Sequence, residues 1–353
     1  MNLLKNTTII IVGNVIANVL AYAFHFIAGR MLGPEQYGEV GSLMALFTLV
    51  AMPASALAGS ISKFTSRFFV DEEYSKIAAL RSRTQRDVLL FSGIVIIVFA
   101  VFSSYIANYL KIDSVFPIII VGITLLFSLL LTLNRGVLQG LKKFKAISWN
   151  SIIEAFARLV LLALFLYFGG SVSATVMAYG FAYFIAYLLV FPLIKEVSMA
   201  TTEGDLIDMK SVYRFSIQVF LVNIIFQTLT NLPSLFIKHY YSNEFNGYWT
   251  AALNIARISQ FVTGAISMVM FPEIVAEKNH QLRTKIFQKS MFFVFLSSSA
   301  VTLVMFLMPQ VILQVLYGNK FLGAAQLLGW MGLAMAFIGS IQVWINYKLA
   351  KLD

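Results

Sequence analysis

Residues 30–39 read Arg-Met-Leu-Gly-Pro-Glu-Gln-Tyr-Gly-Glu, a charged turn between two long apolar stretches. The turn and its flanks recur further along the chain, since a shift of 209 residues aligns Asn14 with Asn223 and Gly38 with Gly247. Both copies combine an apolar stretch that carries amides with an acidic-aromatic-glycine turn. Internal duplication is common among secondary transporters, so this pattern predicts two related halves.

The composition is that of a protein whose side chains mostly face lipid. Of the 353 residues, 59% are hydrophobic and 12% are charged, and the mean hydropathy is +0.82. A soluble domain carries about 25% charged residues, so we predict an all-α polytopic membrane protein. The net charge of +10 is then explained by basic loops beside anionic membrane lipid, a predicted partner, and we expect no nucleic-acid binding.

A spanning helix needs roughly 20 mostly apolar residues, and the sequence contains ten such stretches. They are residues 7–28, 38–61, 88–110, 116–138, 147–168, 172–194, 212–238, 247–271, 287–308 and 321–349. The polar segment 198–211 separates the first six from the last four. We therefore expect a first bundle at 1–197, a linker at 198–211 and a second bundle at 212–353.

The distribution of basic residues predicts the orientation. Twenty Lys and Arg residues fall on one side of the predicted spans and four on the other. Basic loops stay in the cytoplasm, so we expect both termini to be cytoplasmic in a protein of the cell membrane. Six helices before the linker and four after it fit either a natural ten-helix form or the loss of two helices by C-terminal truncation, and we favour truncation.

Two predicted helices carry polar side chains on one face, at steps of three or four residues. The first has Asn14, Asn18, Tyr22 and His25, and the seventh has Asn223, Gln227 and Asn231. An amide that faces hydrocarbon costs about 2–7 kcal/mol, so these faces should contact protein or water. Hydrogen bonds between helices explain a single amide; for the two stripes together we favour a hydrated cavity that binds substrate.

Arg257 lies midway along the predicted eighth helix. Placing an arginine there costs about 2.5–3.5 kcal/mol on insertion scales, so it should face a cavity or a partner. A distant carboxylate is one explanation, but the planar guanidinium also suits two phosphate oxygens. We favour phosphate, and we add Asn254 of the same helix to the candidate substrate contacts.

Five further residues are candidates for a gate or for coupling. Glu154 and Arg158, four residues apart, read first as an ion pair that neutralises both charges in lipid, and their position also allows a gating role. Arg30 and Glu39 flank the first turn. They are either ordinary residues of the membrane–water interface or parts of an outer gate. His25 is either a structural, hydrogen-bonded histidine or one that titrates.

The sequence contains no catalytic signature. Cysteine is absent, the three histidines have no metal-ligand spacing, and no nucleotide-binding or hydrolase motif occurs. We therefore predict a protein that is not an enzyme and that binds no metal and no cofactor.

Several short motifs occur together: 30–38, 63–67 (Lys-Phe-Thr-Ser-Arg), 135–140 (Arg-Gly-Val-Leu-Gln-Gly), 270–273 (Met-Phe-Pro-Glu) and 316–318 (Leu-Tyr-Gly). In combination they resemble the Wzx-type polysaccharide and O-antigen flippases of the multidrug/oligosaccharidyl-lipid/polysaccharide (MOP) exporter superfamily. The resemblance implies two bundles in a V around a central cavity, here with six plus four helices. It also implies a polyprenyl-diphosphate-linked oligosaccharide as substrate and polysaccharide-assembly membrane proteins as candidate partners.

In related lipid II flippases, arginines of the first, second and eighth helices line the cavity, and Arg257 matches the one on the eighth. The arginines midway along the first helix have no counterpart, because Asn18 and Phe24 stand nearby instead. We expect an alternating-access flippase for surface polysaccharide biosynthesis. The alternatives are a cation-coupled multidrug exporter, disfavoured because the first and seventh predicted helices hold no Asp or Glu, and a non-transporting truncated scaffold.

Overall fold

The computed structural model describes residues 3–198, 207–277 and 279–349. Within these ranges the secondary structure is helical and includes no strand. The α-helices are α1 (Leu3–Val70), α2 (Tyr74–Val101), α3 (Ser103–Tyr109), α4 (Phe116–Gly140), α5 (Phe144–Tyr167), α6 (Val172–Val190), α7 (Lys195–Ser198), α8 (Met209–Tyr240), α9 (Asn243–Ala256), α10 (Ile258–Ala276), α11 (His280–Leu307), α12 (Pro309–Leu316) and α13 (Ala325–Leu349). Two short 3₁₀ helices cover Phe191–Ile194 and Asn319–Ala324.

In the described residues, seven helices are long and apolar enough to cross a membrane, or eight when the two segments of the bent α8 count as one span. Helix α1 is one of the seven, but its 68 residues would extend about 100 Å at 1.5 Å per residue, several times a ~30 Å hydrocarbon layer. It is interrupted at Gly33, where φ is 76° and ψ is 175°. Its two segments contain the first two predicted spans, and the all-helical membrane fold is confirmed.

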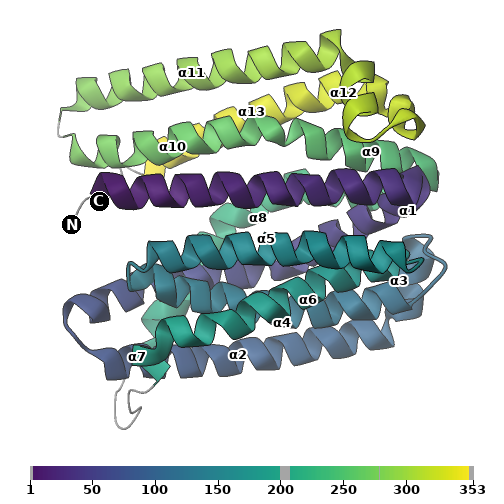
Figure 1. Ribbon diagram of the computed structural model, residues 1–353. Coiled ribbons are helices and arrows are strands. Elements are labelled where there is room, and N and C mark those ends of the chain that lie inside the picture. The colour runs from purple at the N-terminus through teal and green to yellow at the C-terminus, as the bar shows by residue number, and fades with distance from the viewer. Residues whose placement is uncertain (1–2, 199–206, 278, 350–353) are drawn as a thin grey trace. The chain divides into compact units, whose positions relative to one another are not determined.

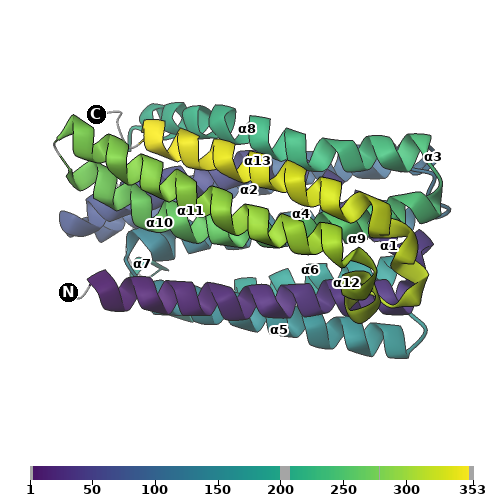
Figure 2. The ribbon, with the colours of Figure 1, turned by 90° about the horizontal axis from the view of Figure 1, so that it is seen from above.

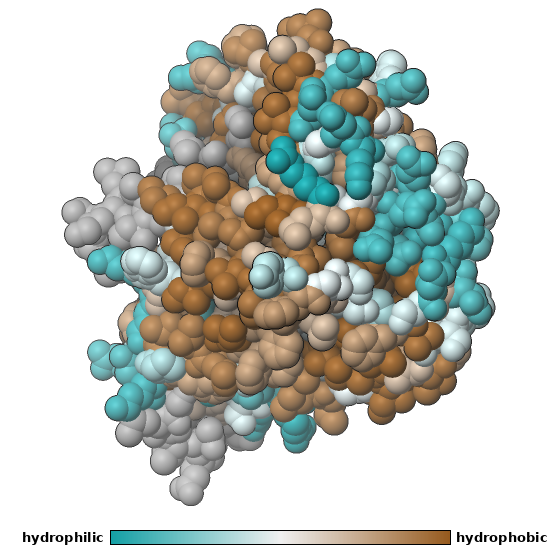
Figure 3. Space-filling model, turned by 45° about the vertical axis from the view of Figure 1, so that its right-hand side comes forward, coloured by the Kyte–Doolittle hydropathy of each residue, from teal (hydrophilic) through white to brown (hydrophobic). Residues whose placement is uncertain are grey.

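The exposed surface of the spanning helices is apolar. On α2, Leu90, Ile94, Ile97 and Val101 are between 61% and 70% exposed and recur at helical spacing. Hydrophobic residues cover broad parts of the face shown in Figure 3. Such a surface suits a lipid environment.

Contacts divide the chain into two compact units. Unit 1 contains the described parts of residues 1–32 and 39–241, and α4 is at its centre, packed against α2 and α6 (Figure 1). Leu129, Val137 and Val190 belong to its buried core. Two glycines let the second segment of α1 approach α4 closely: a Cβ on Gly136 would lie 2.8 Å from the carbonyl oxygen of Ala58, and one on Gly140 would lie 2.4 Å from Thr65 Cβ.

The first segment of α1 lies beside α5 (Figure 2). A Cβ on Gly13 would approach Ser148 Cβ to 2.5 Å, so glycine is needed where these helices meet. Small residues let membrane helices pack closely, where dispersion and not the hydrophobic effect drives association. This contact places the amide-bearing segment of α1 within unit 1.

Unit 2 contains the described parts of residues 33–38 and 242–353. Helices α10, α11 and α13 pack on one another, with α11 and α13 running side by side (Figures 1 and 2). The turn 33–38 packs on the start of α9, where Asn246 Nδ2 donates to the carbonyl oxygen of Gly38 at 2.6 Å. A Cβ on Gly38 would lie 2.6 Å from the nitrogen of Gly247. The two glycines aligned by the sequence repeat therefore meet.

The predicted linker 198–211 falls largely on residues 199–206, which lie outside the described residues. The predicted domain boundary stays a prediction, and contacts group α8 with unit 1. Asp208 caps α8 by accepting from the backbone N–H of Ser211 at 3.2 Å. The Ser211 hydroxyl also donates to this carboxylate, and these bonds hold the pKa of Asp208 below its ordinary value.

Candidate functional site

Three charged side chains meet in the interior of unit 1. The carboxylate of Glu154, on α5, accepts from Arg135 Nη1 of α4 at 2.9 Å through Oε2, and from Arg158 Nη2 through Oε1. The Glu154 side chain is 7% exposed, that of Arg158 11% and that of Arg135 22%. These residues form the Arg–Glu–Arg cluster. Its carboxylate is buried, its guanidiniums are half-buried, and its helices are candidates to span the membrane.

The spacing of α5 builds one half of this site. Asn150, Glu154 and Arg158 follow one another at steps of four residues and share one face of the helix. Asn150 Oδ1 accepts from Arg135 Nε at 2.8 Å, while Asn150 Nδ2 donates to the carbonyl oxygen of Ala186 on α6 at 2.8 Å. Asn150 therefore orients Arg135 toward Glu154 and is itself held by α6.

Aromatic rings of α6 cover the other guanidinium. Arg158 Cζ lies 4.5 Å from the ring centroid of Tyr179 and 5.5 Å from that of Tyr183. The Tyr179 hydroxyl is 3.3 Å from Nε2 of His25 on α1. His25, Glu154 and Arg158, which the sequence assigned to gating or coupling, are thus brought into one connected group.

The cluster contains more positive charge and more donors than its carboxylate can satisfy. Two guanidinium groups face one carboxylate, which leaves one net positive charge. Arg135 Nη2 and Arg158 Nε are buried with no hydrogen-bond partner among the described residues. An unsatisfied buried donor costs about 1–3 kcal/mol, and more when the group is charged. An anion with several oxygens would satisfy both donors.

A third cation is connected to the same end of α4. Arg81 Nε of α2 donates to Oδ1 of Asn134 at 2.8 Å, and Asn134 directly precedes Arg135. The Arg81 guanidinium also lies 5.5 Å from the ring centroid of Phe191. Helices α2, α4 and α5 therefore all contribute arginine to this part of unit 1.

The two predicted amide stripes have different surroundings. On α1, Asn14 is exposed and Asn18 is half-buried. On α8, Asn223 and Gln227 are half-buried, whereas Asn231 is buried and donates through Nδ2 to Gln227 Oε1 at 3.0 Å. The seventh-helix stripe is thus partly satisfied within its own helix, and its role in substrate binding stays a prediction.

Arg257 and Asn254 belong to unit 2. Asn254 is buried, and its Nδ2 donates at 2.8 Å to the hydroxyl of Tyr37, which lies 3.0 Å from the hydroxyl of Tyr317. Arg257 is half-buried at the point where α9 ends and α10 begins. The sequence predicted one continuous helix here. The break at Arg257 was not expected, and its phosphate role stays a prediction.

The predicted outer gate residues also lie in unit 1. Arg30 is exposed near the end of the first α1 segment. Glu39 lies 3.6 Å from Nζ of Lys238, whose side chain is 0% exposed. Lys238 ends the predicted span 212–238, and its ion pair with Glu39 was not predicted from the sequence. The gating role of Arg30 and Glu39 remains untested.

Arg135 and Asn150 were not among the residues predicted from the sequence. Arg135 lies near the end of the predicted span 116–138, and Asn150 lies near the start of the predicted span 147–168. The hairpin register could have revealed the pair, since the turn at Lys142 places Arg135 seven residues before it and Asn150 eight residues after it. Antiparallel helices joined by a short turn bring such positions opposite each other.

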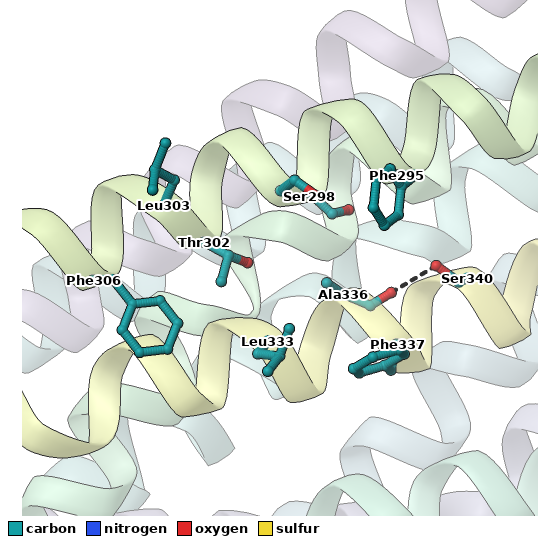
Figure 4. A pocket seen from close by; sticks show the side chains of 10 residues that line it. Phe295, Ser298, Thr302, Leu303, Phe306, Leu333, Ala336, Phe337 and Ser340 are labelled. Carbon is teal, nitrogen blue, oxygen red and sulfur yellow. Dashed lines mark hydrogen bonds between the residues drawn. The ribbon is translucent and has the colours of Figure 1, made fainter.

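Unit 2 contains a separate pocket of about 230 Å³ between α11 and α13 (Figure 4). Its phenyl and leucyl side chains surround the hydroxyls of Ser298 and Thr302, which have no hydrogen-bond partner within the described ranges. Ser340 donates to the carbonyl oxygen of Ala336 at 2.9 Å. The pocket lining includes no predicted site residue. In the described residues no group of three or more His, Asp or Glu side chains could hold a metal ion.

The spanning helices and their buried charges define a multi-pass helical membrane protein. The chain belongs to the family described as polysaccharide biosynthesis protein, whose sequence profile matches residues 3–278.

Individual relatives agree with this assignment. The chain is 24% identical over 310 residues to an uncharacterized membrane protein of Methanocaldococcus jannaschii, with 83% of this chain and 72% of the relative covered. It is 21% identical over 330 residues to a Shigella flexneri protein provisionally named an O-antigen transporter, with 91% and 78% covered.

A solved structure has the same fold. The inward-facing conformation of a multidrug resistance MATE family transporter of the MOP superfamily superposes with a TM-score of 0.76, at 13% identity over 95% of this chain and 83% of that chain. The Wzx-like resemblance and the MOP-type fold predicted from sequence are confirmed.

Proposed function

We propose that this protein is a flippase that moves a polyprenyl-diphosphate-linked oligosaccharide across the cytoplasmic membrane by alternating access. Its family, its relative named as an O-antigen transporter and its transporter fold support this proposal. The amides predicted from the sequence would contact sugar hydroxyls, and the predicted phosphate role of Arg257 is a separate part of this proposal.

One observation carries the choice of an anionic lipid-linked substrate. The Arg–Glu–Arg cluster places two guanidiniums around one carboxylate in a buried setting, and Arg135 Nη2 and Arg158 Nε have no partner in the described part of the chain. A diphosphate offers several oxygens to such donors. Charge-assisted bonds of this kind contribute about 1.5–3 kcal/mol each.

Glu154 gives this site a means of exchange. The carboxylate and an arriving diphosphate compete for the same guanidinium donors, so substrate binding would weaken the hold of Glu154 on Arg135 and Arg158. When the substrate leaves, Glu154 would again accept hydrogen bonds from Arg135 and Arg158. This competition would help the arginines to release the headgroup. Asn150 would keep Arg135 oriented in both states.

The cation-coupled drug exporter fits this cluster less well. Such a protein needs a carboxylate that is available to a cation. Both oxygens of Glu154 are already engaged by arginine, and the cluster has one net positive charge. A cationic drug or coupling ion would meet repulsion there, whereas an anionic headgroup would be attracted.

Transport in proteoliposomes tests the proposal. The purified protein is reconstituted with a labelled polyprenyl-diphosphate oligosaccharide, and translocation is measured as the label becomes accessible to an impermeant reagent. Arg135→Gln and Arg158→Gln should each slow translocation at least ten-fold, because each removes a charge-assisted donor.

Lys143→Gln provides the matched control, since it removes an ion pair with Glu196 in which the side chains are 31% and 60% exposed. The control should transport at the wild-type rate. Normal transport by both arginine variants would refute the role of the cluster, and absence of glycolipid transport by the wild type would refute the function.

A further inference from the structure

We propose that unit 1 also binds one acyl chain of an anionic phospholipid, in a crevice between the second segment of α1, α2 and α8. The crevice has a volume of about 430 Å³, within the ~300–1,000 Å³ typical of ligand pockets. Its apolar walls are Pro53 and Leu57 from α1, Val88 and Phe91 from α2, and Ile217 and Phe220 from α8. This site is separate from the Arg–Glu–Arg cluster and does not depend on the proposed transport activity.

The crevice has a polar end and an apolar end. At the polar end the hydroxyl of Tyr213 donates to Oδ2 of Asp87, and both residues belong to the lining. Ser216 also belongs to the lining, and its hydroxyl is hydrogen-bonded to the hydroxyl of Ser60 at 2.6 Å. From Tyr213 to Phe220 the helix rises about 10 Å. One leaflet of hydrocarbon is about 15 Å deep, so the apolar part matches most of the length of one chain.

Basic residues lie at the polar end. Arg86 precedes Asp87, its side chain is 78% exposed, and its Nε is 3.9 Å from Asp87 Oδ1. Arg83 is exposed one turn earlier on α2, and both arginines are near enough to act electrostatically on Tyr213. Two arginines and one carboxylate leave an excess of positive charge at the mouth of the crevice.

This charge selects the occupant. Acyl chains are as apolar as the crevice walls, so a chain gains packing there but no hydrophobic driving force. The headgroup must therefore decide which lipid stays. A phospholipid phosphodiester is negatively charged, so the basic residues at this end favour an anionic phospholipid over a zwitterionic one.

An acyl chain in the crevice would affect the position of helix α8. Helix α8 bends by 45° between its segments Met209–Leu221 and Asn223–Tyr240. The lining ends at Phe220, directly before this bend. A chain in the crevice would hold the first segment of α8 at a fixed distance from α2.

Photo-cross-linking tests the proposal. The protein is reconstituted with a phosphatidylglycerol that carries a diazirine in one acyl chain, and adducts are mapped by mass spectrometry. We expect adducts on residues 88–91 of α2 and 216–220 of α8, and competition by unlabelled phosphatidylglycerol but not by phosphatidylcholine. The double variant Arg83→Gln/Arg86→Gln should reduce labelling at least five-fold.

A filling variant tests the crevice itself. Ile217→Trp places a large side chain at the exposed edge of the lining and should reduce labelling, whereas Ile225→Trp should not, because Ile225 is similarly exposed on α8 but outside the lining. The proposal would be overturned if neither Arg83→Gln/Arg86→Gln nor Ile217→Trp changed the amount of labelling. Stronger competition by a polyprenyl diphosphate than by phosphatidylglycerol would also overturn it, because the occupant would then be a polyprenyl chain.

Discussion

Glu154 is paired with two half-buried cations at once, and this decides how its neighbours respond to substitution. Removing one partner of a buried ion pair is strongly destabilising because the remaining charge is left uncompensated. Removal of Arg158 leaves Glu154 paired with Arg135, whereas removal of the carboxylate leaves two guanidiniums without an anion. The carboxylate is therefore the most sensitive position of the cluster.

We predict that Glu154→Gln destabilises the protein by about 3–5 kcal/mol and that Arg158→Gln costs less. Thermal unfolding in detergent, followed by intrinsic fluorescence, measures both. Equal melting temperatures for wild type and Glu154→Gln would show that the carboxylate does not hold the two arginines.

Gly247 is a second residue at which the structure sets a strict requirement. A Cβ there would lie 2.0 Å from the carbonyl oxygen of Pro34, which is backbone and unable to move aside easily. Gly264, on α10 of the same unit, differs in this respect, because a Cβ added there would have no neighbouring atom within 4 Å.

Gly247→Ala should therefore lower the melting temperature and the yield of folded protein, because the turn 33–38 can no longer pack on α9. Gly264→Ala should leave stability unchanged or raise it by up to about 1 kcal/mol, since alanine is the better helix former. Size-exclusion profiles and melting curves of the two variants provide the comparison. A harmless Gly247→Ala would contradict the close contact between the two repeats.

At the scale of elements, the sequence predicted the spans well because hydrophobic length depends on local composition. Every predicted span corresponds to helical structure in the described residues. The break between α9 and α10 at Arg257 was not predicted, because an apolar sequence on both sides does not reveal where the helix is interrupted. The cluster around Arg135 was also not predicted, because its residues come from three helices and meet only through the packing of α4, α5 and α6.

The start of α8 allows a prediction on one element. The pKa of Asp208 is lowered chiefly by the hydrogen bond from the Ser211 hydroxyl. A lowered pKa means that this cap stabilises the helix above the ordinary carboxyl pKa and is lost as the pH falls through the lowered value. Asp208→Ala should then speed amide hydrogen exchange in the first turn of α8 at pH 7.

The same comparison at acidic pH provides the check. Once the wild-type carboxyl is protonated, wild type and Asp208→Ala should exchange at similar rates in this turn. A difference that persists below the lowered pKa of Asp208 would mean that the ionised carboxylate is not what caps α8.

At the scale of the whole molecule, the duplication predicted from sequence explains why Gly38 and Gly247 face each other in unit 2. The matched amides Asn18 and Gln227 have no such simple outcome, because Gln227 Oε1 accepts from Asn231 of its own helix α8. Repeats preserve a fold more faithfully than a site, since a site requires particular partners from other helices. The Arg–Glu–Arg cluster illustrates this, because Glu154 and Arg158 were visible as a pair but Arg135 came from another helix.

We propose that the Arg–Glu–Arg cluster binds the diphosphate of a lipid-linked substrate. Equilibrium binding of a polyprenyl diphosphate to the purified protein, with the neutral polyprenol as reference ligand, tests this role. We expect Arg135→Gln to weaken diphosphate binding by at least ten-fold and to leave polyprenol binding unchanged, whereas Lys143→Gln should change neither affinity. Equal diphosphate affinities for wild type and Arg135→Gln would contradict it.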